Sequence, residues 1–232
     1  MSGRIDLDRI AFIGRTYREY RNIFGLDDGA LRRGRILDCP AGASSFAGEG
    51  REKGHDVTAC DLLYSLPPDE LVRKARADTD YALRQAYKVR EMYDWGFYGG
   101  VEGHRAEREK ALLLFAGDFT AGLKEGRYVP ARLPALPFKD GSFSLVLSGH
   151  FLFLYGDRLD FDFHLQSLIE LARVGGEVRV FPTVGLEGGP YPGLDRLIEY
   201  LKQAHVCAEV VKTPFEFMKG ADRMLKLTRL DK

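Results

Sequence analysis

Apolar positions near the start of the chain follow a helical spacing and then give way to short apolar runs. Aromatic and aliphatic residues at positions 12, 13, 17, 20, 23 and 24 lie among Arg and Glu residues, which predicts an amphipathic helix over 8–24. The apolar run 35–41 (RILDCPA) is followed by a glycine and predicts a strand and a turn. A helix-compatible stretch at 44–53 and a β-rich run at 56–62 complete a strand, helix, strand opening.

The residues that follow the second strand are charged and lack strand periodicity. They predict two helices, over 69–93 and 102–124, and therefore a helical insertion of about 67–126 between the second and third strands. The run 112–119 (LLLFAGDF) also admits a strand. Its apolar residues are helically spaced, however, and a strand there would leave the β-rich run at 128–133 without a place, so the helix is preferred.

The remainder of the chain alternates β-rich runs with two helical segments. Strands are predicted over 142–148, 177–182, 208–212 and 223–230, and helices over 163–173 and 194–204. The last two strands are separated only by a loop, so we expect them to pair antiparallel. The alternation of strands and helices predicts one α/β domain over 1–232.

Composition and charge narrow the range of partners. Apolar residues make up 45% of the chain and charged residues 29%, and Lys plus Arg equals Asp plus Glu at 34 each. A formal net charge of zero provides no global field that would attract nucleic acid or anionic lipid. The longest apolar stretch, 143–155, is broken by polar residues and is too short to span a bilayer. We expect a small-molecule partner, no nucleic acid and no membrane, unless Arg105, Arg108 and Lys110 form an exposed basic face.

The cysteines and histidines show no metal-binding pattern. Cys39, Cys60 and Cys207 are widely spaced and form no CxxC pair, which argues against a disulfide framework and against a structural zinc site. The histidines lack metal-ligand spacing as well, so no metal site is expected. Free thiols fit a reducing compartment, and we therefore predict a cytoplasmic protein.

Small residues and two acids mark the first strand, helix, strand unit as a ligand site. The turn after the first strand runs from Asp38 to Ser44 around Gly42. Such a turn brings backbone N–H groups and a helix N-terminus to the carboxyl edge of a parallel sheet, where open α/β sheets bind ligands. Asp61 ends the second strand, about twenty residues after Asp38, where a carboxylate accepts hydrogen bonds from ribose hydroxyls. The sequence therefore predicts a nucleoside-containing ligand at this edge.

Three segments in order resemble class I S-adenosylmethionine (AdoMet) methyltransferases. LDCPAGASSF resembles the D-x-G-x-G-x-G turn of that family, with Asp38, Gly42 and Ser44 in matching places and Pro40 where a glycine is usual. The segment 133–153 (LPALPFKDGSFSLVLSGHFLF) resembles the family's approach to its fourth strand and the strand itself, and 168–181 (LIELARVGGEVRVF) resembles its helix, paired glycines and fifth strand. The segments IGRTYREYRNIF, GDRLDFDFH and FEFMKGADRML are similar to an uncharacterised prokaryotic subgroup.

The resemblance implies a fold, a cofactor and a set of site residues. The implied fold is a doubly wound, Rossmann-like, seven-stranded sheet with a reversed C-terminal hairpin, and the implied cofactor is AdoMet. The predicted cofactor-binding residues are Tyr17, Tyr20, Asp38, Cys39, Pro40, Ala41, Gly42, Asp61, Leu62, Leu133, Ser148 and Gly149. Arg132 occupies the position where the family commonly has an adenine-contacting acid, and a strand at 112–119 would instead give that role to Asp118. His150, just after the fourth strand, is the predicted general base.

The acceptor site is expected between the insertion and the loops after the fourth and fifth strands. Candidate wall residues are Tyr155, Asp157, Arg158, Thr183 and Tyr191. The predicted function is methyl transfer from AdoMet to a small molecule. A non-catalytic AdoMet-binding module stays open because Pro40 and Arg132 depart from the family pattern. An NAD-dependent oxidoreductase is disfavoured because this turn lacks G-x-G-x-x-G.

Overall fold

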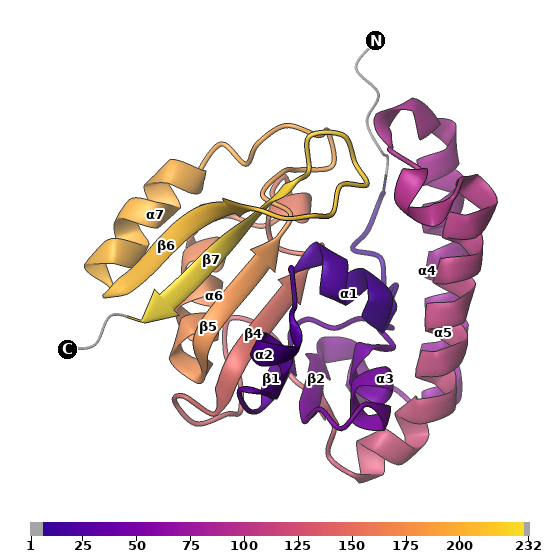
Figure 1. Ribbon diagram of the computed structural model, residues 1–232, viewed down its shortest axis with the longest axis horizontal. Helices are drawn as coiled ribbons and strands as arrows, with labels where there is room; N and C mark the ends of the chain where they lie inside the picture. The colour runs from indigo at the N-terminus through magenta and orange to yellow at the C-terminus, as the bar shows by residue number, and fades with distance from the viewer. Residues whose placement is uncertain (1–6, 230–232) are drawn as a thin grey trace.

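A mixed sheet of seven strands, in the order β3-β2-β1-β4-β5-β7-β6, forms the centre of the computed structural model (Figure 1). The structure describes residues 7–229. The strands are β1 (Ile36–Asp38), β2 (Val57–Asp61), β3 (Tyr128–Pro130), β4 (Phe143–Gly149), β5 (Gly175–Phe181), β6 (Val206–Lys212) and β7 (Arg223–Arg229). The first five pair in parallel, whereas β7 is antiparallel to both β5 and β6. This order, with its reversed last hairpin, confirms the predicted fold class.

Helices cover both faces of the sheet. They are α1 (Tyr17–Ile23), α2 (Asp28–Arg32), α3 (Phe46–Glu52), α4 (Pro68–Lys88), α5 (Val101–Lys124), α6 (Phe161–Val174) and α7 (Leu194–Gln203). Side chains alternate between faces along each strand, so neighbouring strand residues enter different cores. Ile36 packs with α3 and α5, whereas Leu37 packs with α6 and α7. Within the described residues, no helix combines the length and the apolar character that a membrane span requires.

The topology fixes where a ligand can bind. Both β2 and β4 flank β1, so the chain order reverses direction between β1 and β4. In open α/β sheets the connections on either side of such a point leave in opposite directions and open a crevice at the carboxyl ends of the strands. Asp38 at the end of β1 lies opposite Leu147 of β4 and Ala59 of β2. The crevice therefore opens beside the turn that follows Asp38.

The insertion between β2 and β3 is helical, as predicted. Helices α4 and α5 pack against each other, and α5 also packs against α3 and β3 (Figure 1). Phe115 and Phe119 of α5 are fully buried and contact Tyr128. Asp118 accepts hydrogen bonds from Arg127 at 2.6 Å and from the Tyr128 hydroxyl at 2.7 Å. The strand alternative for 112–119 is therefore wrong, and Asp118 has a structural role.

The N-terminal segment differs from the predicted helix over 8–24. The helix spans only Tyr17–Ile23, and it begins with a capping box in which Thr16 and Glu19 satisfy each other's backbone N–H groups. Residues 7–16, which we call the N-terminal strap, are not helical. The Phe12 N–H donates to Asp78 of α4 at 2.9 Å, and the Ala11 N–H donates to the Tyr155 hydroxyl at 3.1 Å. Phe12 is therefore buried by tertiary contacts rather than as part of one helical face.

The helix α2 was not predicted. It is a short five-residue helix, Asp28–Arg32, and the Asp27 carboxylate caps it by accepting the Ala30 N–H at 2.6 Å. A helix of this length shows no apolar periodicity from which it could be recognised.

Replacing Phe119 tests the helical assignment of the insertion. Phe119→Ala leaves a cavity among the buried aromatic rings and is expected to lower the free energy of unfolding by about 3–5 kcal/mol. Leu113→Ala in the same helix changes a residue that is 63% exposed and should stay within about 0.5 kcal/mol of wild type. Urea unfolding followed by circular dichroism measures both, and equal losses would contradict this packing.

Candidate functional site

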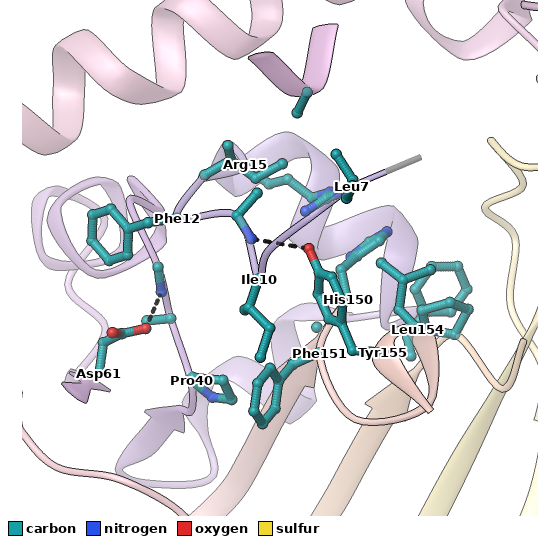
Figure 2. A pocket seen from close by; sticks show the side chains of 18 of the residues that line it. Leu7, Ile10, Phe12, Arg15, Pro40, Asp61, His150, Phe151, Leu154 and Tyr155 are labelled. Carbon is teal, nitrogen blue, oxygen red and sulfur yellow. Dashed lines mark hydrogen bonds between the residues drawn. The ribbon is translucent and has the colours of Figure 1, made fainter. Parts of the chain in front are cut away.

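A cavity of about 580 Å³ lies at the carboxyl edge of the sheet (Figure 2). Its walls come from the strap, the turns after β1 and β2, the ends of β4 and β5, the insertion, and the loop 213–222 between β6 and β7. Most of the lining side chains are apolar. The predicted site residues that line it are Tyr20, Cys39, Pro40, Ala41, Gly42, Asp61, Leu62, Leu133, Gly149 and His150. Residues far apart in the chain therefore meet in one space of ligand size.

Three of the predicted cofactor residues lie outside this lining. The Tyr17 hydroxyl is 3.0 Å from Nε2 of His55, and the Tyr17 ring stacks on Phe46. Asp38 is fully buried behind Tyr20. Ser148 is buried too, and its hydroxyl has no hydrogen-bond partner within residues 7–229.

Glycine is required in the turn after β1 because two backbones meet there. Gly42 has a φ of +58°, and a Cβ at this position would lie 2.5 Å from the carbonyl oxygen of Ile13 in the strap. The strap also uses the turn's donors, since the Ala43 N–H donates to the Ile13 carbonyl and the Ser45 N–H to the Arg15 carbonyl. The Ser44 hydroxyl accepts from the Phe46 N–H at 3.1 Å, at the start of α3. Strap and turn thus form one rigid wall of the cavity.

Asp61 is held in a fixed orientation at the end of β2. Its Oδ2 accepts the Gly42 N–H at 3.1 Å and its Oδ1 accepts the Leu63 N–H at 2.9 Å. Burial raises the pKa of Asp61, and these two N–H groups oppose the rise. A carboxylate has about four lone-pair positions, so two acceptor positions remain after these bonds. Figure 2 shows the carboxylate at the cavity wall below Phe12, where its remaining lone pairs are available to hydroxyl groups of a ligand.

Asp38 orients Tyr20 rather than facing the cavity. The Tyr20 hydroxyl lies 2.9 Å and 2.8 Å from the two carboxylate oxygens, and its ring stacks on Phe46 with centroids 4.5 Å apart. Burial raises the pKa of Asp38 to about 8, although hydrogen bonds from Tyr20 and Ser44 oppose the rise. Asp38 is therefore mostly protonated at neutral pH, and it acts on the cavity through the Tyr20 ring.

His150 lies at the end of β4 in a left-handed backbone conformation. Its φ is +55°, its N–H donates to the Phe181 carbonyl at 2.6 Å, and its ring stands edge-on to Phe181. Burial holds the pKa of His150 well below its ordinary value, and the guanidinium groups of Arg15 and Arg108 lower it further. The imidazole is therefore neutral at pH 7.

The sequence did not predict several of the lining residues as site residues. They are Arg15 of the strap, Tyr93, His104 and Arg108 of the insertion, and Phe215, Phe217 and Met218 of the loop 213–222. Arg108 is buried, forms an ion pair with Glu19 and donates to the Gly14 carbonyl. It therefore belongs to the interior and not to an exposed basic face with Arg105 and Lys110. No local pattern marks these residues, because only tertiary packing brings them together.

The aromatic residues of the insertion form a packed cluster. Tyr93 stacks on Phe217 at 4.5 Å, and Trp95 and Tyr98 meet the ring of His104 edge-on. Of this group, Tyr93 and His104 reach the cavity. The cluster fastens the insertion to the loop 213–222 and closes one end of the cavity.

The predicted acceptor-wall residues are divided between the cavity and its surroundings. Tyr155 lines the cavity, and Arg158 donates to the Leu7 carbonyl of the strap. Asp157 pairs with Arg158 at 3.7 Å. Thr183 is buried beside the cavity without lining it, and Tyr191 stacks on His164 of α6. In the part of the chain that the structure describes, no group of three or more His, Cys, Asp or Glu side chains has the arrangement of a metal site.

Comparison with known proteins identifies one close relative. The chain is 34% identical over 228 residues to the uncharacterized protein MJ0045 of Methanocaldococcus jannaschii, across 97% of this chain and 99% of the relative. The chain belongs to the family of that archaeal protein. No family model matches the chain.

Solved structures provide more distant likenesses. A putative AdoMet-dependent methyltransferase of Methanococcus maripaludis aligns over 93% of this chain and 84% of its own, at 12% identity and a TM-score of 0.45. A TehB-like methyltransferase of Corynebacterium glutamicum aligns over 92% and 95%, at 18% identity and a TM-score of 0.44. The 1,6-didemethyltoxoflavin-N1-methyltransferase of Burkholderia thailandensis, solved with its substrate and S-adenosylhomocysteine, aligns over 93% and 84%, at 15% identity and a TM-score of 0.41. Values this low transfer neither a ligand nor an activity to the chain.

The raised pKa of Asp38 has a measurable consequence for stability. The unfolded carboxyl group ionises near pH 4, whereas the folded one keeps its proton until about pH 8. Between these values the folded state binds more protons, so its stability relative to Asp38→Asn should fall as the pH rises and level off above pH 8. Urea unfolding of both proteins from pH 5 to pH 9 tests this. Parallel curves across that range would contradict the buried, protonated Asp38.

Proposed function

We propose that the protein is an AdoMet-dependent methyltransferase that acts on a small molecule. The observation that carries the proposal is the Asp61 carboxylate, which two backbone N–H groups hold at the wall of a ligand-sized cavity with acceptor positions to spare. It stands beside a turn that only glycine can form, at the point where the strand order reverses. This combination fits a ligand with ribose hydroxyls.

Different residues of the cavity would contact the ribose, the adenine and the amino-acid part of the cofactor. Asp61 would accept hydrogen bonds from the ribose hydroxyls, and the apolar side chains of Leu62 and Leu133 would contact the adenine. The turn around Gly42 and the side chain of Tyr20, which Asp38 fixes, would hold the amino-acid part. The exposed Arg132 follows the same wall, so apolar contacts and backbone groups rather than a carboxylate would hold the adenine there.

The main task of the protein in this reaction is to align the acceptor with the methyl group. AdoMet supplies a methyl group that is already activated by its positively charged sulfur. The cavity holds the acceptor in line with that methyl group and excludes water from it. His150 accepts the proton that the acceptor oxygen or nitrogen loses as the new bond to carbon forms. Its neutral imidazole is in the protonation state that this role requires.

Ligand selectivity and one substitution test the cofactor site. S-Adenosylhomocysteine and AdoMet should raise the melting temperature, whereas NAD should not. Asp61→Ala should weaken the binding of S-adenosylhomocysteine by about 1.5–3 kcal/mol for each charged hydrogen bond lost. Calorimetric titration measures this change. Asp56→Ala, at the other end of β2, serves as the matched control because its carboxylate lies at the surface. Stabilisation by NAD alone, or equal affinity in the two variants, would refute the proposed site.

Replacing His150 tests catalysis. His150→Asn keeps a residue that tolerates the left-handed conformation, and it should lower the rate of methyl transfer about a hundredfold while leaving cofactor affinity nearly unchanged. His205→Asn is the control, because His205 also has a positive φ, of 59°, but is exposed at the end of α7. Fractions of a metabolite extract supply candidate acceptors, and the release of S-adenosylhomocysteine from AdoMet is the measured product. Tight AdoMet binding without release from any fraction would favour a non-catalytic binding module.

A further inference from the structure

One part of the cavity differs in composition from the region around Asp61. We call it the acceptor chamber and define it by Arg15, Tyr93, His104, Tyr155, His150, Phe215, Phe217 and Met218, all of which line the cavity. It lies between the strap, the insertion and the loop 213–222. Its walls are mainly aromatic and apolar, but it contains one cation.

The cation is the guanidinium group of Arg15. Within residues 7–229 this side chain has no hydrogen bond and no ion pair, whereas its neighbour Arg108 is paired with Glu19. Glu19 pairs with Arg108 and also accepts the Tyr98 hydroxyl and the Thr16 N–H, and it forms no ion pair with Arg15. Part of the Arg15 surface is accessible, and this surface faces the cavity. Burial lowers the pKa of Arg15, yet a guanidinium group stays charged in proteins.

The charge of Arg15 acts on the acceptor chamber and on Tyr20, but not on the predicted ribose acid. It opposes the rise that burial causes in the pKa values of Tyr93 and Tyr155, and it adds to the burial that lowers the pKa of His104 to about 3. The pKa of Asp61 shows no contribution from Arg15. Figure 2 agrees, since Arg15 lies above Tyr155 and His150, on the side away from Asp61.

The same region has other unsatisfied polar atoms. Nε of Arg108 and Nδ1 of His104 are buried without a hydrogen-bond partner in the described chain. Buried polar atoms in native proteins are almost always paired, and each exception needs an explanation. The chamber and its immediate surroundings therefore hold one unpaired positive charge, that of Arg15, and two buried nitrogen atoms without a hydrogen-bond partner among residues 7–229.

We propose that the methyl acceptor is an anion, a small apolar or aromatic molecule whose carboxylate or phosphate group pairs with Arg15 in the acceptor chamber. This inference rests on the proposed function. A buried charge without a partner is costly, and an arginine fork is well matched to a planar carboxylate or to phosphate. The aromatic walls from Phe215, Phe217 and Tyr93 would bury the rest of the molecule. The anion anchors the acceptor, and the methylated atom faces the cofactor.

The carboxylate of the cofactor's own methionine part is the competing source of the same chemistry. The strap carbonyls already use the N–H groups of Ala43 and Ser45, so that carboxylate also needs a partner. The experiment must therefore separate a cofactor contact from an acceptor contact at Arg15.

Four probes and three variants make that separation by calorimetric titration. S-Adenosylhomocysteine carries the carboxylate and 5′-methylthioadenosine lacks it, while benzoate and benzamide differ in charge but hardly in shape. Arg15→Met removes the charge, Arg15→Lys keeps it, and Arg32→Met, at the exposed end of α2, is the control. Benzoate and benzamide are titrated into wild type with and without saturating S-adenosylhomocysteine.

We expect wild type loaded with S-adenosylhomocysteine to bind benzoate at least tenfold more tightly than benzamide. Arg15→Met should lose that preference, Arg15→Lys should retain part of it, and Arg32→Met should retain all of it. For each of the two nucleoside probes, the dissociation constants of wild type and of Arg15→Met should agree within about threefold. The comparison of benzoate with benzamide on wild type needs no variant, so it stands even if Arg15→Met does not fold.

Two results would overturn the inference. A tenfold loss of affinity for S-adenosylhomocysteine in Arg15→Met, with the affinity for 5′-methylthioadenosine unchanged, would assign Arg15 to the cofactor carboxylate. Equal binding of benzoate and benzamide by wild type would exclude an anion site. If S-adenosylhomocysteine does not bind at all, the proposed function fails, and the benzoate titration without it still reports on the anion site separately.

Discussion

Direct contact between two backbones, at Gly14 of the strap and Gly42 of the first turn, determines the shape of the site. A Cβ on Gly14 would lie 1.8 Å from the Ala43 carbonyl oxygen, and one on Gly42 would lie 2.5 Å from the Ile13 carbonyl oxygen. Both distances are far inside van der Waals contact, so any larger residue at either position would push the strap off the turn. The strap is thereby held across the carboxyl edge of the sheet, and it carries Arg15 into the cavity and positions the start of α1, from which Tyr20 reaches Asp38.

The charges near the strap follow from that placement. Glu19 closes the capping box at the start of α1 and also receives Arg108 from the insertion, so one buried carboxylate joins strap and insertion. Breaking such a pair would leave an uncompensated buried charge, which is strongly destabilising. With Glu19 committed in this way, Arg15 is left as the positive group of the chamber. The same backbone contact that forms one wall of the proposed cofactor site therefore also creates the electrostatic character proposed for the acceptor side.

The sequence predicted those features whose cause is local or periodic. The sheet, the two long insertion helices and the residues of the turn around Gly42 follow from apolar runs, helical spacing and glycine. The helix over 8–24 was wrong in its first half because Phe12 and Ile13 satisfy a helical spacing, but Phe12 is buried against Phe115 of the insertion and Gly14 must lie flat against the turn. Arg15, Arg108 and Met218 could not be predicted as neighbours, because they lie in three segments far apart in the chain and none carries a local motif.

The proposed base and the proposed anionic acceptor depend on each other electrostatically. Burial is the main reason why the pKa of His150 lies well below its ordinary value, and the positive charges of Arg15 and Arg108 lower it further. A neutral acceptor leaves that penalty in place, so His150 would be a weak base toward it. An anion on Arg15 cancels one of the two charges and makes the protonated imidazole more stable. Base catalysis by His150 is therefore most effective with an acceptor that brings its own negative charge, and a neutral acceptor would have to lose its proton to another group.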